Sequence, residues 1–85
     1  MPHYIVEHEY QEPLTDQQHN DEAIRSEPCL KQYGVTWHGS WLATDRLRMI
    51  CSFEAESAEQ VRDAHRSADV KFVRVWPVHR YLPEK

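Results

Sequence analysis

The order in which hydrophobic periodicity changes along the chain most constrains its fold. Strand-like alternation, with a period of two residues, gives way twice to the wider spacing of an amphipathic helix. A capping box precedes each predicted helix, Thr15 with Gln18 and Ser57 with Gln60, and provides partners for the free backbone N–H groups at a helix start. The predicted elements are strands over 3–10, 35–43, 46–55 and 71–76, and helices over roughly 16–33 and 58–69.

Proline and glycine refine these boundaries. Pro28 is expected to kink the first helix or to make it restart, because proline lacks a backbone N–H and disfavours helical geometry at the preceding residue. Gly34 is expected to end that helix, since glycine adopts the left-handed conformation of a C-terminal cap. Pro77 fits an edge strand, where no ladder donor is required.

Six elements in the order β-α-β-β-α-β indicate an α+β, ferredoxin-like sandwich, in which two helices cover one face of a four-stranded antiparallel sheet. A single domain over residues 1–85 is expected, which buries only about 60% of the surface of its unfolded chain. We expect an apolar patch on the other sheet face, and therefore a homodimer that forms through the sheet. Residues expected on that face are drawn from Ile5, His38, Leu42, Ile50 and the tryptophans.

Composition narrows the function classes. The formal net charge is -4 and the sequence shows no basic stripe, which argues against a nucleic-acid partner. No segment approaches the ~18 apolar residues of a membrane span, and the N-terminus lacks the apolar core of a signal peptide. Cys29 and Cys51 are too few for a disulfide framework and too far apart for a zinc knuckle. We expect a soluble cytoplasmic protein with no membrane partner.

Three of the six histidines are expected to meet at one end of this fold. His8 lies near the end of the first strand, His19 near the start of the first helix and His65 near the end of the second. Chain direction in the predicted topology places all three at the same end of the sandwich. Asp69 follows His65 by four residues and Glu22 follows His19 by three, which places each carboxylate on the helical face of its histidine. Imidazole with carboxylate suits nickel, zinc, copper or iron.

Several of these residues also have plain structural interpretations. His19 alone is more often a half-exposed helix residue than a ligand, whereas His65 lies in a stripe of small apolar residues where an unpaired imidazole is costly. Cys51 is expected to be a small buried hydrophobe that could also line the pocket. Glu54 lies at the opposite end of the third strand from His8 and is expected to contact a neighbouring strand or a helix start. Surface or dimer-interface roles are expected for His3, His38 and His79.

A diffuse pattern over most of the chain is similar to a known family. Its residues are His8; His19 with Glu22, where the family has His-x-x-Asp; Tyr33-Gly34-Val35; Trp41; Cys51; Glu54-Ala55 with Ala58-Glu59; and His65-Arg66. Through them the chain resembles a family of small ferredoxin-like proteins described as nickel-binding and otherwise catalogued as a domain of unknown function. The chain departs from that family by about one extra helical turn around residues 25–30. It also has Asp69-Val70 where nickel-type members carry His-Gly.

The resemblance implies a homodimeric metal-binding protein concerned with nickel sequestration or sensing, with nickel favoured over zinc and copper. The expected metal-site residues are His8, His19, Glu22, His65 and Asp69. One alternative is a dimeric α/β-barrel enzyme of the cofactor-poor monooxygenase or isomerase type, in which a histidine acts as general base on a small organic molecule. Another is an interaction module without metal or catalysis. An enclosed apolar cavity beside His8 and His65 favours the enzyme, whereas a tightly filled layer between helices and sheet counts against it.

Overall fold

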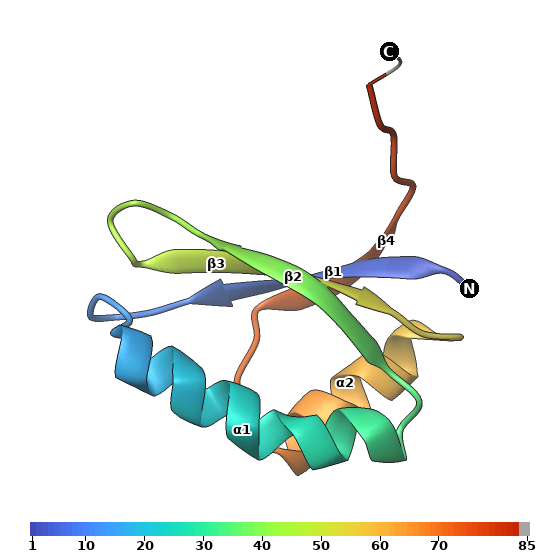
Figure 1. Cartoon of the computed structure of the whole chain (residues 1–85), viewed down its shortest axis with the longest axis horizontal. Coiled ribbons are helices and arrows are strands. Elements are labelled where there is room, and N and C mark those ends of the chain that lie inside the picture. The colour runs from blue at the N-terminus through green and yellow to red at the C-terminus, as the bar shows by residue number, and fades with distance from the viewer. Residues whose placement is uncertain (84–85) are drawn as a thin grey trace.

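The six predicted elements occur in the predicted order in a computed structural model, which describes residues 1–83 (Figure 1). Both capping boxes form as expected. The last two residues of the predicted domain 1–85 lie outside the described residues. The elements are β1 (His3–Glu9), α1 (Asp16–Gln32), β2 (Thr36–Leu42), β3 (Arg48–Glu54), α2 (Ala58–Ser67) and β4 (Arg74–Val78).

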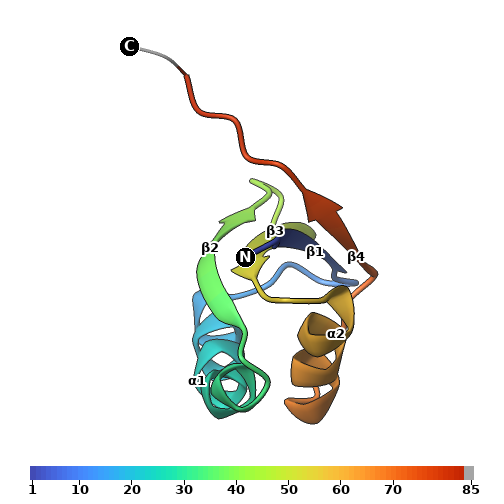
Figure 2. The same cartoon turned by 90° about the vertical axis from the view of Figure 1, so that its right-hand side faces the viewer.

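The four strands form one antiparallel sheet in the order β2-β3-β1-β4, and both helices lie against the same face of it (Figure 2). This arrangement confirms the predicted ferredoxin-like sandwich. Pro77 lies in the edge strand β4, as its missing N–H requires. Among residues 1–83, none of the helices has the length and apolar character needed to cross a membrane.

Alternation in β1 and β3 sets one row of side chains against the helices. The core is densest beneath α2, whose Val61, Ala64 and His65 are buried. By contrast, all 17 residues of α1 retain some exposure to solvent. On the helix-covered face, the buried residues Tyr4, Val6 and His8 of β1 lie opposite Phe53, Cys51 and Met49 of β3.

A β-bulge in β2 breaks the strict alternation predicted for residues 35–43. The pairing with β3 shifts between Trp37 and Gly39, so that His38 is an extra residue in the strand. Gly39 has a φ of 151°, a backbone conformation that residues other than glycine rarely adopt. The bulge allows both Trp37 and Ser40 to line the space beneath the sheet.

Two other local predictions differ from the structure. Of the two outcomes expected at Pro28, the restart does not occur, because α1 runs uninterrupted through this residue. Because α1 lies at the surface, water can solvate the carbonyl group that proline leaves without an N–H partner. The last strand begins at Arg74 instead of residue 71, because residues 71–73 form a connection in which the Lys71 carbonyl binds a side chain of β1.

The open face of the sheet carries the large apolar side chains expected there. Trp41 lies opposite Ile50, and Trp76 lies opposite Ile5. Trp41, Ile50 and Trp76 are exposed, whereas Leu42 pairs with buried Met49 on the helix-covered face. The Trp76 indole N–H donates to Glu7 Oε2 at 2.7 Å.

Candidate metal and ligand site

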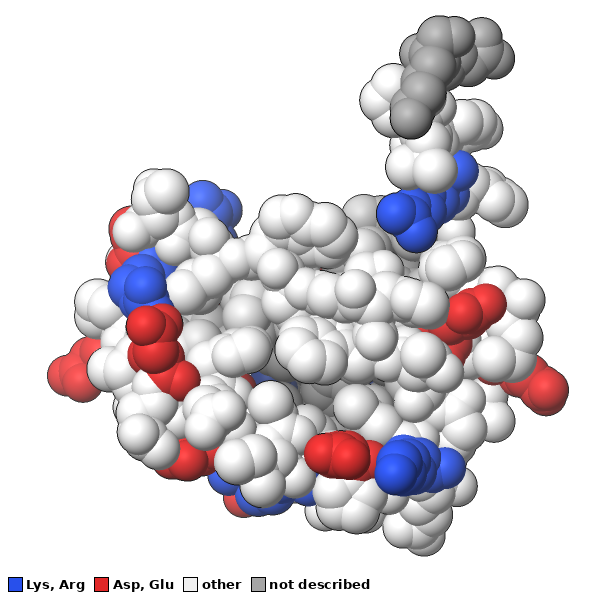
Figure 3. All heavy atoms as spheres, in the orientation of Figure 1, with Lys and Arg blue, Asp and Glu red and all other residues white. Residues whose placement is uncertain are grey.

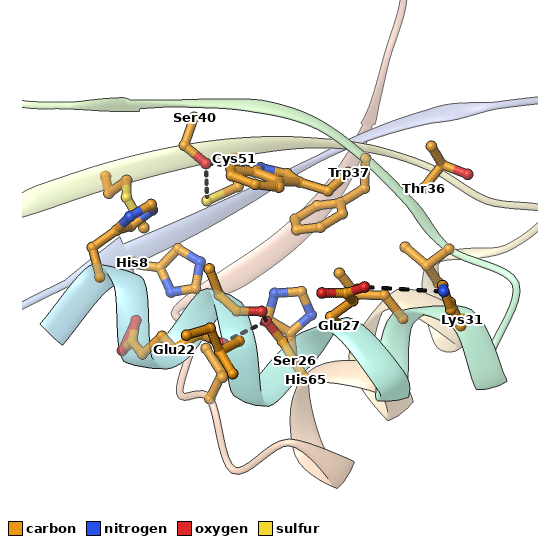
Figure 4. Close-up of a pocket in the computed structure, with 18 residues that line it drawn as sticks. His8, Glu22, Ser26, Glu27, Lys31, Thr36, Trp37, Ser40, Cys51 and His65 are labelled. Carbon is orange, nitrogen blue, oxygen red and sulfur yellow. Dashed lines mark hydrogen bonds and ion pairs between the residues drawn. The ribbon is translucent and has the colours of Figure 1, made fainter. Parts of the chain in front are cut away.

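A cavity of about 470 Å³ lies between α1 and the sheet, and its lining is mainly apolar. Figure 3 shows the face of the molecule hollowed in this region, with mostly uncharged side chains around the hollow. The walls come from α1, β2 and β3, with His8 contributed by β1 and His65 by α2 (Figure 4). The layer between α1 and the sheet is therefore only partly filled by side chains.

His8 and His65 lie next to each other in this cavity. Their ring centroids are 5.8 Å apart, and the two side chains are almost completely buried. This proximity follows from the topology, because His8 is near the end of β1 and His65 is in the last turn of α2. The structure therefore places these two histidines side by side, and the third predicted histidine, His19, lines the same cavity.

Each imidazole uses its Nδ1 to bind a backbone carbonyl group. His8 Nδ1 donates to the Lys71 carbonyl at 2.8 Å, and His65 Nδ1 donates to the Val61 carbonyl at 2.8 Å. A carbonyl oxygen only accepts, so Nδ1 carries the proton and a neutral ring keeps a lone pair on Nε2. Within residues 1–83, neither Nε2 has a hydrogen-bond partner. Metal-binding histidines in proteins are commonly oriented by this kind of hydrogen bond.

Burial keeps both rings neutral. It lowers the pKa of His8 to about 4, because the hydrogen bond to Lys71 only partly offsets the loss of solvation. Burial also lowers the pKa of His65, again against a hydrogen bond that favours the charged form. Both lone pairs are consequently available at neutral pH.

Aromatic rings hold the two imidazoles in place. Phe53 and Phe72 meet the His65 ring edge-on, with centroid separations of 5.2 and 5.6 Å. Tyr10 stacks parallel to His8 at 6.4 Å. The Tyr10 hydroxyl group is buried and lacks a hydrogen-bond partner among the described residues, and burial together with Glu22 raises its pKa. Tyr10 follows His8 by two residues, the strand spacing that places both on one face, whereas nothing in the sequence marks Phe72 as a neighbour of His65.

The separation of the two rings fits a shared metal ion. An ion about 2.1 Å from Nε2 lies about 3.3 Å from the centroid of the ring. If two rings bind one ion at right angles, their centroids are about 4.6 Å apart. If they bind it from opposite sides, their centroids are about 6.5 Å apart. The observed 5.8 Å between His8 and His65 falls in this range.

The third and fourth predicted donors, Glu22 and His19, line the same cavity. Glu22 projects from α1, and burial raises the pKa of its carboxyl group. His19, one turn earlier on α1, lies beside Trp37 with ring centroids 6.2 Å apart. Within residues 1–83, no group of three or more His, Cys, Asp or Glu side chains is arranged to hold a metal ion. His8 and His65 thus lie side by side, and a ligand set of three protein side chains requires movement of a side chain.

Cys51 lines the cavity as a thiol. It accepts a hydrogen bond from the Ser40 hydroxyl group at 2.9 Å, and burial raises its pKa to about 11. Because metal ions bind the thiolate form, Cys51 is a poor ligand at neutral pH. Its position agrees with the expected role as a small buried hydrophobe in the pocket wall.

The four-residue spacing predicted that Asp69 shares a helical face with His65. This prediction was wrong. The α2 helix ends at Ser67, and Asp69 follows it in a left-handed conformation with a φ of 55°. Its side chain lines a different surface pocket, and its carbonyl group accepts a hydrogen bond from Arg25. The end of the helix therefore separates this carboxylate from the histidine pair.

A second histidine group lies at the opposite end of the sheet. His38 donates from Nε2 to Glu54 Oε1 at 2.9 Å, and this hydrogen bond lowers the pKa of Glu54. The His3 ring lies 5.7 Å from that of His38. Glu54 is opposite His3 in the β1–β3 register, far from His8, as predicted. The contact with a neighbouring strand that was expected for Glu54 is therefore present, and its partner is His38 of β2.

Comparisons with known proteins agree with this architecture. A family model described as "Nickel responsive protein SCO4226-like" matches residues 4–78. The crystal structure of SCO4226 from Streptomyces coelicolor A3(2) superposes with a TM-score of 0.84. The two chains are 21% identical, and the alignment covers 94% of this chain and 99% of the other. No curated protein matches the sequence. At this identity, the structural similarity establishes the fold alone.

Proposed function

The chain belongs to the SCO4226-like nickel responsive protein family, and we propose that it binds one divalent transition-metal ion, nickel in the first place, between His8 and His65. The observation that supports this most is the pair of buried neutral imidazoles, each oriented through Nδ1 by a backbone carbonyl group. The family description supports nickel over zinc or copper. Such binding would serve either nickel sequestration or nickel sensing.

Metal binding at this pair would connect two distant parts of the chain. His8 belongs to β1 and His65 to α2, and Glu22 or His19 of α1 could complete the ligand set by rotation of a side chain. An ion held by all three elements would draw α1 towards the sheet. Such a change in the position of α1 would suit a sensor, because ion binding would alter the surface of the protein.

Calorimetry of chelator-stripped protein tests this proposal. We expect nickel to bind with a stoichiometry of one per chain, and His65→Ala to weaken that binding at least tenfold. His79→Ala is the matched control, because His79 is exposed and distant in sequence from the cavity-lining residues. The absence of heat with nickel, zinc and copper, or equal losses in the two variants, contradicts the proposal.

The cavity favours a second candidate function. A space of about 470 Å³ beside His8 and His65 is large enough for a small organic molecule, but it is an open groove and not the enclosed cavity that the enzyme interpretation expected. In that case a buried imidazole would act as general base. Binding of small aromatic acids by the metal-free protein, with no detectable affinity for nickel, would favour this function over the first.

We also propose that the protein forms a homodimer through the open face of its sheet. Support comes from the exposed Trp41, Ile50 and Trp76 on that face. A reducing, cytoplasmic location belongs to the same proposal, because Cys29 and Cys51 are both free thiols.

A further inference from the structure

The cavity is much larger than a metal ion needs. Its volume of about 470 Å³ corresponds to roughly fifteen water molecules in the liquid. A nickel ion with six water ligands would occupy less than half of that space. Figure 4 shows His8 towards one end of the cavity, and Glu27, Lys31 and Thr36 away from it. Apolar side chains, including Leu30, Val35 and Phe53, form part of the cavity lining.

The charge of the ion is poorly compensated by the protein alone. An imidazole binds a metal ion through a lone pair and is neutral when it does so, so an ion held by His8 and His65 keeps both positive charges beside a mainly apolar wall. Glu22 can offset one of these charges at most. Glu27, the other carboxylate of the lining, lies 4.0 Å from the ammonium group of Lys31. An anionic ligand in the cavity would offset the charge that remains.

The protein also supplies few donor atoms. Nickel(II) in proteins takes four or more ligands, commonly in tetragonal arrangements of nitrogen and oxygen. Residues 1–83 offer two neighbouring imidazoles but no set of three candidate ligands arranged around one point. A bound nickel ion would therefore lack ligands and charge compensation, and the same cavity has empty volume with apolar walls.

We propose that the cavity takes its metal ion as a complex with a small anionic organic chelator, which supplies the missing donors and charge and fills the volume beyond the histidine pair. This inference rests on the proposed function and identifies the form in which the metal is bound. An aromatic chelator fits best, because Trp37 and Phe53 offer ring surfaces in the lining.

The test uses the one-to-one nickel complex of pyridine-2,6-dicarboxylate. This chelator is planar, tridentate and doubly negative, so its nickel complex is neutral and leaves positions open for two imidazoles. We expect calorimetry to show binding of the complex at least tenfold tighter than that of the aqueous nickel ion. Gel filtration is expected to show one nickel and one chelator co-eluting per chain.

The outcomes separate this inference from the proposed function. If aqueous nickel binds but the chelator removes it and elutes apart from the protein, the inference is wrong and the proposed function stands. If neither form of nickel binds, both are wrong. If the complex binds no more tightly than the aqueous ion, the chelator contributes nothing and the inference is also overturned.

A pair of tryptophan variants tests where the chelator binds. Leu30→Trp adds volume in the α1 wall of the cavity, and we expect it to weaken binding of the complex at least tenfold. Leu82→Trp adds the same volume at an exposed position outside the cavity lining and is expected to leave binding of the complex unchanged. Equal binding of the complex to both variants would place the chelator outside the cavity and contradict the inference.

Discussion

At the scale of the residue, the buried imidazoles make the metal-free protein sensitive to acid. Burial favours the neutral ring of His8 in the folded state, with a pKa of about 4, whereas the unfolded chain takes up this proton near pH 6.5. The unfolded state therefore binds more protons as the pH falls from 6.5 to 4, and stability declines over this window. Above pH 6.5 the ring is neutral in both states and contributes no pH dependence.

We predict that acid destabilises the metal-free protein through His8 by about 3 kcal/mol between pH 6.5 and pH 4. Urea denaturation at several pH values measures this change. In His8→Gln, which cannot take up the proton, the loss of stability over the same window is expected to be smaller. His79→Ala serves as control and is expected to keep the slope of the original protein. Equal slopes in all three proteins would show that His8 does not carry the effect.

At the scale of the element, the β-bulge in β2 positions the cavity wall. It sets Trp37 and Ser40 on the cavity side and leaves His38 to bind Glu54 on the far end of the sheet. Gly39 makes the bulge possible through its positive φ of 151°. The space around the α-carbon of Gly39 is open, so any cost of substitution comes from the backbone.

We predict that Gly39→Ala destabilises the protein by about 1–3 kcal/mol, because alanine does not tolerate this φ. Gly34→Asn is the matched control, because Gly34 has a φ of 68°, which asparagine adopts at helix ends. The expected loss in the free energy of unfolding for this variant is below about 1 kcal/mol. Denaturant unfolding measures both. Equal stability of Gly39→Ala and the original protein would contradict this role for the bulge.

The order of elements could be predicted from the sequence because it depends on local signals. Alternation identified the strands, and the capping boxes at Thr15 and Ser57 identified both helix starts. The proximity of His8 to His65 then followed from chain direction. What could not be predicted depends on backbone detail, such as the end of α2 before Asp69. The carbonyl partners of the imidazoles and the bulge at Gly39 also arise only from the three-dimensional packing.

At the scale of the whole molecule, the proposed dimer depends on the open sheet face. Trp41 is 62% exposed and lies opposite Ile50, which is 41% exposed, and a second copy would cover this pair. The α1 helix, on the opposite side of the sheet, carries Ile24 with a similar exposure of 65%. These two exposed side chains on opposite surfaces allow a matched comparison.

We predict a dimer by light scattering at micromolar concentration, which Trp41→Asp converts to a monomer because a buried unpaired charge is costly at an apolar interface. Ile24→Asp introduces the same charge on the helix side and is expected to remain a dimer. A monomeric original protein would contradict the dimer. A dimer that persists in Trp41→Asp would place the interface elsewhere.

The central claim is that His8 and His65 bind one ion together through Nε2, and X-ray absorption at the nickel edge tests it most directly. We predict scattering from two imidazole rings at about 2.1 Å in the loaded protein, and from one ring in His65→Ala loaded at high nickel concentration. A spectrum with oxygen ligands alone, or one that is the same in the original protein and in His65→Ala, would contradict the claim.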